Sequence, residues 1–305
     1  MALYGLLNLH KPSGVTSRRA VDQVVRLVKP AKVGHAGTLD PLASGVLVVG
    51  IGAATRLVEY VQMMRKQYRA TFLLGRSSTT EDVEGEITLH DDAPRPTLAA
   101  IEQAATQLVG EILQRPPDFS ALKVSGRRAY ALARAGQQVE LAPRPIQIHR
   151  LEITRYEYPE LCFDVECGSG TYVRSLGRDL AELAGTTAVM SALVRTAIGP
   201  FGLERAIRPA ELSRENIEQH LLPAVLAVRG LMPACRVSTE ELARLANGLP
   251  IEGVQLADQA SAGARECGTV ESGSVAALDA DGSLVAILSR RDDGQYTPSK
   301  FFAAR

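Results

Sequence analysis

The sequence predicts an α+β fold with a small β-rich domain at its C-terminal end, and it disfavours a doubly wound parallel sheet. The 305 residues are 46% hydrophobic and 22% charged, which is the composition of a globular chain with a sizeable core. Segments with helical periodicity are interspersed irregularly with segments that alternate as strands do. From about residue 230 onward strand signals dominate, over a length that suffices for one small domain.

Two N-terminal helices are predicted where a capping residue precedes apolar residues at helical spacing. Thr16 or Ser17 caps the first helix, and Pro30 ends it because proline cannot continue a helix. Thr97 caps the second helix, whose apolar face is expected to extend to Ile112. Both helices therefore have one apolar face to place on a sheet.

The remaining elements are two further helices and a set of short strands. The leucines within 176–183 are spaced as on a helix, and Ser238 with Glu241 forms the capping box of another helix near the C-terminus. A DADG turn between two apolar runs predicts a C-terminal hairpin. Strands are expected at 46–52, 68–74, 161–167, 275–278 and 284–288.

Charge is balanced over the whole chain but unevenly distributed along it. Residues 1–76 hold 11 basic and 3 acidic residues, and residues 115–155 hold 8 and 3. Between them, residues 77–114 hold 1 basic and 8 acidic residues. The two basic blocks predict either a basic face for a polyanion such as nucleic acid or an ordinary mixed surface.

The most distinctive stretch is GHAGTLDPLASGVLVVGIGAATR at 34–56. Gly34 and Gly37 permit tight backbone geometry around His35 and Asp40. An aspartate directly before a proline is typical of a helix that Asp40 would cap. The alternative is a carboxylate displayed on a rigid, glycine-bounded loop, where it could act as a nucleophile or a base.

No pattern in the sequence favours a metal or a cofactor. Gly50-x-Gly52-x-x-Thr55 is a partial dinucleotide fingerprint that lacks the third glycine and the downstream acid, so an oxidoreductase is only a weak alternative. The five histidines and four cysteines show no metal-ligand spacing. The expectation is therefore an activity with no metal and no cofactor.

Five motifs together resemble the TruB family of tRNA pseudouridine synthases. The family's catalytic motif is the most specific, and the likeness covers about residues 5–205. After the third motif, KQYRATFLLG, the family pattern continues with Ser78, Thr80, Asp82 and Gly85. Val194, in contrast, stands where the family usually has a basic residue. The motifs are LLNLHKPSGVTS (6–17), GHAGTLDPLASGVL (34–47), KQYRATFLLG (66–75), SALKVSGRRAYALARAG (120–136) and GTYVRSLGRDL (170–180).

The resemblance implies an isomerase that converts uridine to pseudouridine in the T-loop of tRNA, at tRNA position 55, after flipping the base out of its stack. It implies Asp40 as the essential catalytic carboxylate, with Arg174 paired to it. Two routes stay open, attack by Asp40 at C6 or C1′, and cleavage through a glycal. Residues implied to bind the flipped nucleotide or its surroundings are His35, Tyr68, Tyr172, Arg174 and Leu193.

The resemblance also implies a pseudouridine synthase catalytic domain at 1–230, with a mixed, largely antiparallel sheet flanked by helices, and a PUA-like RNA-binding domain at 231–305. A cytoplasmic monomer that binds the tRNA T-arm without an obligate protein partner, membrane, metal or cofactor is expected. A non-catalytic RNA-binding protein and a guide-dependent synthase are the alternatives. Candidates for RNA backbone contacts are Lys11, Arg18, Arg19, Lys123, Arg127, Arg128 and Arg178.

Overall fold

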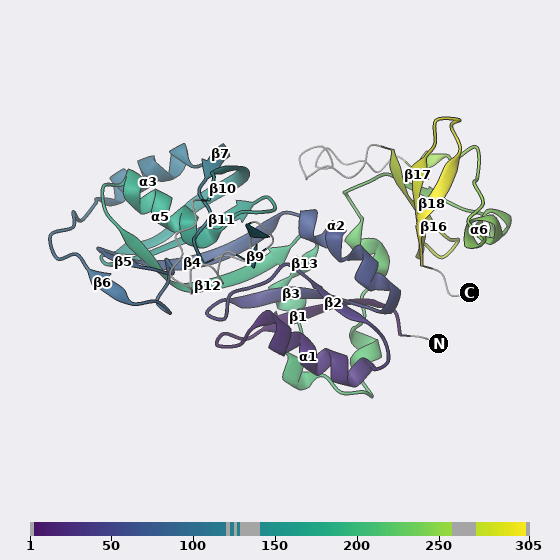
Figure 1. The fold of residues 1–305 in the computed structure, drawn as a ribbon, viewed down its shortest axis with the longest axis horizontal. Helices are drawn as coiled ribbons and strands as arrows, with labels where there is room; N and C mark the ends of the chain where they lie inside the picture. The colour runs from purple at the N-terminus through teal and green to yellow at the C-terminus, as the bar shows by residue number, and fades with distance from the viewer. Residues whose placement is uncertain (1–2, 120–122, 125–126, 129–140, 258–272, 303–305) are drawn as a thin grey trace. The chain divides into compact units, whose positions relative to one another are not determined.

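The computed structural model describes residues 3–119, 123–124, 127–128, 141–257 and 273–302 (Figure 1). The chain packs into two compact units, which are described separately below. Unit 1 comprises Met1–Pro41, Gly45–Met64 and Ala197–Arg305. Unit 2 comprises Leu42–Ser44 and Arg65–Thr196.

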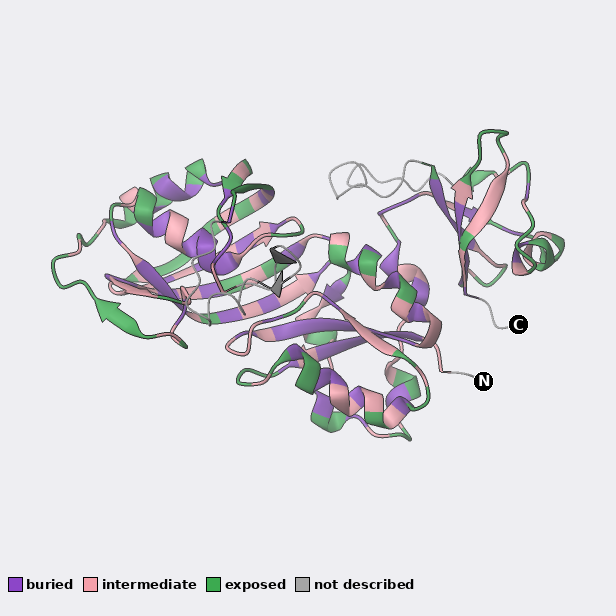
Figure 2. Cartoon of the chain, viewed as in Figure 1, coloured by how far each residue is buried: buried purple, intermediate pink, exposed green. Residues whose placement is uncertain are grey.

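The centre of unit 1 is an antiparallel arrangement of N-terminal strands. β1 (Gly5–Lys11) pairs antiparallel with β3 (Ser44–Ile51) along its whole length. β2 (Val33–Ala36) forms a hairpin with the second half of β3, with His35 opposite Val49. Figure 2 shows β1 and β3 almost wholly buried, as expected for strands that are covered on both faces.

One face of these strands is covered by helix α1 (Ser17–Val28). The side chain of Thr16 accepts a hydrogen bond from the backbone N–H of Arg19 at 3.2 Å, which confirms the predicted N-terminal cap. The apolar stripe of α1 packs on side chains of β1 and β3 that point to the same face. The buried residues of this layer include Ala20, Val21, Val24, Val28, Leu7, Leu9, Leu47, Val49 and Ile51.

A second apolar layer in unit 1 joins N-terminal and C-terminal segments. It contains Leu6, Val46 and Val48 from β1 and β3, and it extends to Ile287 and Phe302 near the C-terminus. Tyr4 stacks on Phe302 with ring centroids 6.3 Å apart. The remaining short elements of unit 1 before the C-terminal sheet are η1 (Gly52–Leu57), α2 (Val58–Met63), β13 (Phe201–Gly202), η2 (Leu203–Arg205), η3 (Pro209–Glu211), η4 (Ile217–His220) and η5 (Ala224–Ala227).

The C-terminal part of unit 1 is a small five-stranded sheet with one helix. The strand order is β15-β14-β16-β17-β18, and the predicted hairpin is β16 with β17. Ser238 and Glu241 form the predicted capping box of the helix. The elements are β14 (Ala234–Arg236), α6 (Thr239–Ala246), β15 (Leu256–Ala257), β16 (Ser274–Leu278), β17 (Leu284–Arg290) and β18 (Tyr296–Phe301).

Unit 2 is built on strands in the order β12-β4-β11-β10-β7, with α3 and α5 packed together on one face (Figure 1). Gly177 of α5 lies directly against the Phe72 ring, where a Cβ would lie 2.1 Å from ring carbons. The elements are β4 (Lys66–Leu74), β5 (Arg76–Ser78), β6 (Ile87–Leu89), α3 (Leu98–Gln107), β7 (Gly110–Gln114), β8 (Lys123–Val124), β9 (Arg127–Arg128), β10 (Arg144–Glu157), β11 (Glu160–Cys167), α5 (Val173–Leu183) and β12 (Ala188–Ile198).

The α+β fold class is confirmed, and its large sheet is antiparallel in each strand pair of unit 2 for which the register is given. One boundary was wrong. Ile112 lies on β7 and not on the preceding helix, because the chain leaves helical geometry after Gln107 and Gly110 adopts φ 106°. The domain boundary at residue 230 stays a prediction. None of the described helices is both long and apolar enough to cross a membrane.

Candidate active-site loop and its supports

Asp40 lies on the loop that connects β2 to β3. No helix begins after Pro41, so the interpretation of Asp40 as a helix cap was wrong. Gly37 turns the chain out of β2 with φ 79°, a conformation that costs glycine little. Asp40 itself is half-buried. The structure therefore has the displayed-carboxylate arrangement, which was the alternative interpretation of this motif.

The Asp40 loop is fixed on both sides of the aspartate. On one side, the Leu39 N–H donates to the Ser17 hydroxyl at 2.8 Å, and that hydroxyl donates to the Leu39 carbonyl at 3.0 Å. On the other side, the Gly14 N–H donates to the Pro41 carbonyl at 2.8 Å. Because these bonds act on the backbone of the two neighbours of Asp40, they restrict where its carboxylate can move.

Lys11 holds the turn that leads from β1 to α1. Its side chain is fully buried, and its ammonium donates to the carbonyls of Pro12 at 2.9 Å and Val15 at 2.6 Å. A longer contact of 3.4 Å reaches the carbonyl of Pro41, next to Asp40. The expectation that Lys11 contacts the RNA backbone was therefore wrong, because a buried ammonium bound to main-chain oxygens is not available to a phosphate.

Replacing Lys11 with Met is expected to destabilise the protein by about 2–4 kcal/mol. Methionine keeps the apolar stem but removes three donors, and it leaves the part-buried carbonyls of Pro12 and Val15 without this partner. The free energy of unfolding from urea titration measures the effect. Lys32→Met, at an exposed position of unit 1, is the control and is expected to change stability by less than ~0.5 kcal/mol. Equal stability of the two variants would contradict this role of Lys11.

The glycines after β3 have a structural use that excludes the dinucleotide interpretation. A dinucleotide fingerprint needs a strand that is parallel to its neighbours within a βαβ unit. β3 is antiparallel to both β1 and β2. Gly50 instead allows close contact with the Ala54 carbonyl, and Gly52 adopts φ 61° against the Leu3 carbonyl. The oxidoreductase alternative was therefore wrong.

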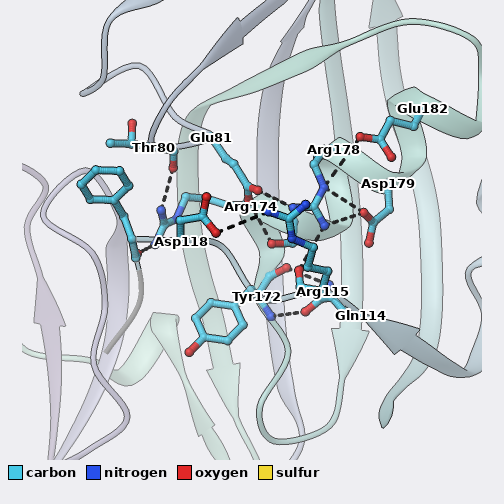
Figure 3. Close-up of polar contacts among 12 residues, drawn as sticks. Thr80, Glu81, Gln114, Arg115, Asp118, Tyr172, Arg174, Arg178, Asp179 and Glu182 are labelled. Carbon is cyan, nitrogen blue, oxygen red and sulfur yellow. Dashed lines mark hydrogen bonds and ion pairs between the residues drawn. The ribbon is translucent and has the colours of Figure 1, made fainter. Parts of the chain in front are cut away.

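Arg174 is a buried cation of unit 2, as are Lys66 and Arg195. Figure 3 shows the polar contacts of Arg174. This residue lies in the first turn of α5, where its guanidinium donates to the carbonyl of Thr80 at 2.7 Å and to that of Phe119 at 3.0 Å. The carboxylate of Asp82 is 3.8 Å away. Because a guanidinium is planar and carries five donors, it can hold several acceptors in fixed directions at once.

The segment that receives Arg174 is itself ordered by polar contacts. The Thr80 hydroxyl donates to Asp82 Oδ1 at 2.6 Å, and the Glu84 N–H donates to the same oxygen at 3.1 Å. Thr80 and Asp82 belong to the motif pattern, but the pattern alone indicates no role for either residue. Their signal was the spacing of a hydroxyl and a carboxylate two residues apart, which is typical of a side-chain-stabilised turn.

Glu81 is a half-buried acid that no sequence motif points to. Its carboxylate accepts from the Ser175 hydroxyl at 2.9 Å and pairs with Arg178 (Figure 3). Burial raises the pKa of Glu81, while Arg178 acts in the opposite direction. Arg178 also contacts Asp179 at 2.7 Å. Because this guanidinium already bonds two carboxylates, an RNA backbone contact by Arg178 stays a prediction.

Tyr172, Tyr68 and Leu193 occupy defined positions in unit 2. Tyr172 precedes α5, and its backbone N–H and carbonyl both bond to the side chain of Gln114, at 2.8 and 3.1 Å. Tyr68 is half-buried on β4 opposite Val165, and Leu193 is buried on β12. Tyr172 and Arg174 both lie at the start of α5, Tyr172 at the position that precedes the helix and Arg174 in its first turn.

The remaining candidates are surface residues or lie outside the described side chains. Arg18 pairs with Asp22 at 2.7 Å one helical turn away, and Arg19 is exposed on α1. The side chains of Lys123, Arg127 and Arg128 are outside the described residues. His35 and Asp40 belong to unit 1, whereas the other implied nucleotide-binding residues belong to unit 2, so the Asp40–Arg174 pair stays a prediction.

Within the described residues, no group of three or more His, Cys, Asp or Glu side chains is placed to hold a metal ion. The polar groups around the Asp40 loop are instead main-chain oxygens that accept from Lys11, Gly14 and Ser17. The chemistry that this loop can supply is that of one carboxylate held in place, as a nucleophile or as a charge that stabilises a developing cation.

Comparison with known sequences gives close matches. The model of the TruB family pseudouridylate synthase (N terminal domain) matches residues 25–173. The tRNA pseudouridine synthase B of Arthrobacter sp. (strain FB24) is 44% identical over 300 residues, which are 96% of this chain and 94% of the relative. That of Mycobacterium bovis (strain BCG / Pasteur 1173P2) is 39% identical over 303 residues, which are 97% and 94% of the two chains.

Comparison with solved structures supports the same fold. A chain of the archaeal box H/ACA sRNP Nop10–Cbf5 complex matches with a TM-score of 0.72 and 24% identity, covering 100% of this chain and 88% of that one. A chain of an H/ACA RNP bound to a substrate RNA containing 2′-deoxyuridine matches with a TM-score of 0.72 and 24% identity, covering 99% and 86%. From the extent and identity of the curated relatives, this chain belongs to the TruB family of pseudouridylate synthases.

Proposed function

We propose that this protein is an isomerase that converts uridine to pseudouridine in the T-loop of tRNA, at tRNA position 55. The observation that carries the proposal is the Asp40 loop, whose sequence matches the family's catalytic motif and whose backbone is fixed on both sides of the carboxylate. The relatives that share 37–44% of its residues over most of the chain are named for this reaction.

The reaction moves the ribose from one atom of the base to another. The N1–C1′ bond breaks, the uracil turns, and a C5–C1′ bond forms, while C5 loses its hydrogen as a proton and N1 gains a proton. The balance needs no oxidant, reductant or hydrolytic water. Asp40 acts either by attacking C6 or C1′, or by assisting cleavage while a glycal forms through loss of the C2′ proton. Both routes require one carboxylate next to the sugar–base junction.

The other implied residues bind the flipped nucleotide. Tyr68 stacks on the uracil, and in the glycal route it also acts as the general base. Tyr172 and Leu193 line the uracil pocket and exclude water from it. His35 fills the space that the flipped nucleotide leaves, and Arg174 orients the Asp40 carboxylate. Each of these roles concerns the enzyme with RNA bound, and a single substitution of the residue tests each one.

The enzyme acts as a cytoplasmic monomer, without a guide RNA or an obligate protein partner, and uses residues 231–305 as a PUA-like RNA-binding domain. The match to bacterial relatives over more than nine-tenths of both chains supports this, because those relatives have nearly the same length. The solved structures that match are instead named as complexes with further proteins or RNA.

The test is tritium release from tRNA that carries 5-tritiated uridine, followed by mapping of the modified position. Purified protein alone is expected to release tritium into water, because only formation of the C5–C1′ bond displaces that hydrogen. One modified uridine in the T-loop is expected. Binding of tRNA without tritium release would identify a non-catalytic RNA-binding protein, and activity only after addition of a guide RNA would identify a guide-dependent enzyme.

A further inference from the structure

A pocket of about 370 Å³ lies between α1 and η3 of unit 1. Arg19, Gln23 and Arg26 of α1 line one side, and their spacing of four and three residues places them on one helix face. Arg208 and Pro209 line the other side. The Gln23 amide donates to the Pro209 carbonyl, so a hydrogen bond fixes the distance between the two walls.

Three arginines line this pocket, and none of them has a neutralising partner among the described residues. No hydrogen bond or ion pair joins the side chains of Arg19, Arg26 or Arg208 to another described residue. The pocket lining contains no Asp or Glu. The nearby carboxylate of Glu211 accepts the backbone N–H of Arg208 at 3.2 Å. Uncompensated guanidinium groups that converge on one concave surface attract an anion, and their geometry favours phosphate.

His10 at the end of β1 also lines the pocket. Burial and the charge of Arg208 lower the pKa of His10, and Glu211 acts weakly in the opposite direction. At neutral pH the imidazole is therefore largely uncharged and does not repel the arginines. Arrival of an anion would raise the pKa of His10, which makes this histidine a reporter of occupancy.

Two residues that line the pocket also bind Lys11, whose ammonium contacts the Asp40 loop. Pro12 and Val15 line the pocket, and the carbonyls of these two residues are the main acceptors of the Lys11 ammonium. The same ammonium reaches the carbonyl of Pro41, beside Asp40. A strand whose target nucleotide reaches Asp40 therefore has its neighbouring backbone close to the turn that borders this pocket.

We propose that Arg19, Arg26 and Arg208 form a binding site for a backbone phosphate of the substrate RNA, outside the target uridine. The proposal rests on the proposed function, because it takes the RNA that reaches Asp40 as its ligand. The three arginines are exposed and come from two distant parts of the sequence. Lys11, which the sequence suggested as an RNA backbone contact, is buried instead. The contacts of the arginines position the RNA and do not read its bases.

The first test compares two charge-matched triple variants in an Asp40→Asn background, which prevents turnover during binding. One carries Arg19→Gln, Arg26→Gln and Arg208→Gln. The control carries Arg150→Gln, Arg155→Gln and Arg291→Gln, whose side chains are exposed and ion-paired to neighbouring carboxylates. Thermal unfolding of both checks that they are folded.

The pocket variant is expected to bind a T-arm hairpin about 10-fold or more weakly at ~0.1 M salt, and the slope of log K against log salt is expected to become shallower by roughly 0.7–0.9 per phosphate contact removed. The control is expected to keep the affinity and slope of the parent to within twofold. Equal affinity and equal slopes for the two triple variants would overturn the proposal.

The second test separates an RNA phosphate from a free nucleotide. The NMR signal of the His10 ring, assigned by its loss in His10→Gln, is titrated with pH in the presence of the T-arm hairpin, uridine monophosphate or inorganic phosphate. The hairpin is expected to raise the pKa of His10 in the parent and not in the pocket variant. Saturable binding of uridine monophosphate with no response to the hairpin would overturn the proposal in favour of a nucleotide site.

Failure of this inference and failure of the proposed function give different results. If the parent with Asp40 forms pseudouridine and the pocket variant binds RNA like its control, the inference fails while the function stands. If the parent forms no pseudouridine, the function fails whatever the salt slopes show.

Discussion

Asp40→Asn is expected to reduce pseudouridine formation by more than about 10³-fold, a loss typical of removing a group that takes part in the chemistry. The amide has nearly the shape of the carboxylate but lacks its negative charge and is a poor nucleophile. It can neither bond covalently to C6 or C1′ nor stabilise positive charge on the ribose. The expected loss is therefore the same for either route.

The fold and RNA binding should survive this substitution. The anchors of the Asp40 loop act on the main chain of Leu39 and Pro41, and they do not depend on the charge of residue 40. The free energy of unfolding, measured by urea titration, is expected to change by less than ~1 kcal/mol. The affinity for a T-arm hairpin is expected to change by only a few fold. The variant should bind RNA and leave it unmodified.

Tritium release and mass spectrometry of the treated tRNA measure the result. Asp22→Asn is the matched control, because Asp22 is a partly exposed carboxylate of unit 1 whose partner Arg18 lies one helical turn away. Such a pair contributes little to stability, so full activity is expected. Product formation by Asp40→Asn at a rate near that of Asp22→Asn would show that Asp40 is not the essential carboxylate.

The elements that could be predicted from sequence are those that local interactions determine. The Thr16 cap, the stripe of α1 and the capping box at Ser238 involve residues within one or two helical turns of each other. The predicted helix through Ile112 failed because β7 owes its existence to pairing with β10, some 35 residues later, rather than to its own pattern. Long-range pairing overrides periodicity in a short apolar segment.

The sequence around Asp40 fits both a helix cap and a displayed loop carboxylate, and sequence alone does not distinguish the two structures. An Asp–Pro pair suits a helix start, yet here Pro41 lies in a loop whose carbonyl accepts from Gly14, 27 residues earlier. Similarly, the buried state of Lys11 follows from main-chain oxygens that gather around it only after folding. Charge counting gives the number of basic residues in a block but does not distinguish such a lysine from an exposed arginine.

The sequence also does not show which arginine forms an ion pair with an acidic side chain. Arg178 and Arg19 are both arginines on helices that the sequence predicts. Arg178 is neutralised by Glu81, which lies 97 positions away, whereas Arg19 has no carboxylate within ion-pair distance among the described residues. Only the fold reveals which cations remain for an RNA. The phosphate pocket depends on this distinction, since Arg208 meets α1 only through the tertiary structure.

Arg174→Lys is expected to reduce kcat by about 10²-fold or more and to lower the free energy of unfolding by about 1–3 kcal/mol. The stability loss follows from geometry. A guanidinium serves the carbonyls of Thr80 and Phe119 together, at 2.7 and 3.0 Å, while also facing Asp82. A lysine ammonium on a single stem cannot keep both carbonyl bonds and the direction toward Asp82, so a buried acceptor loses its donor.

The activity loss has a separate cause and a separate readout. If Arg174 orients Asp40, the substitution misplaces the reacting carboxylate, and an error of about 1 Å is enough for a 10²-fold loss. kcat should therefore fall at temperatures where the variant is fully folded, while the affinity for the T-arm hairpin stays within a few fold. A purely structural role would lower the unfolding midpoint without changing kcat in the folded enzyme.

Arg178→Lys is the matched control on the same helix. Arg178 bonds to the carboxylates of Glu81 and Asp179 and to the Arg115 carbonyl at 3.1 Å, so its replacement by lysine is also expected to lower the free energy of unfolding. Its kcat is expected to stay within about threefold of the parent, since no reacting group depends on it. Equal loss of kcat in the two lysine variants would mean that α5 as a whole, and not the guanidinium of Arg174, supports the chemistry.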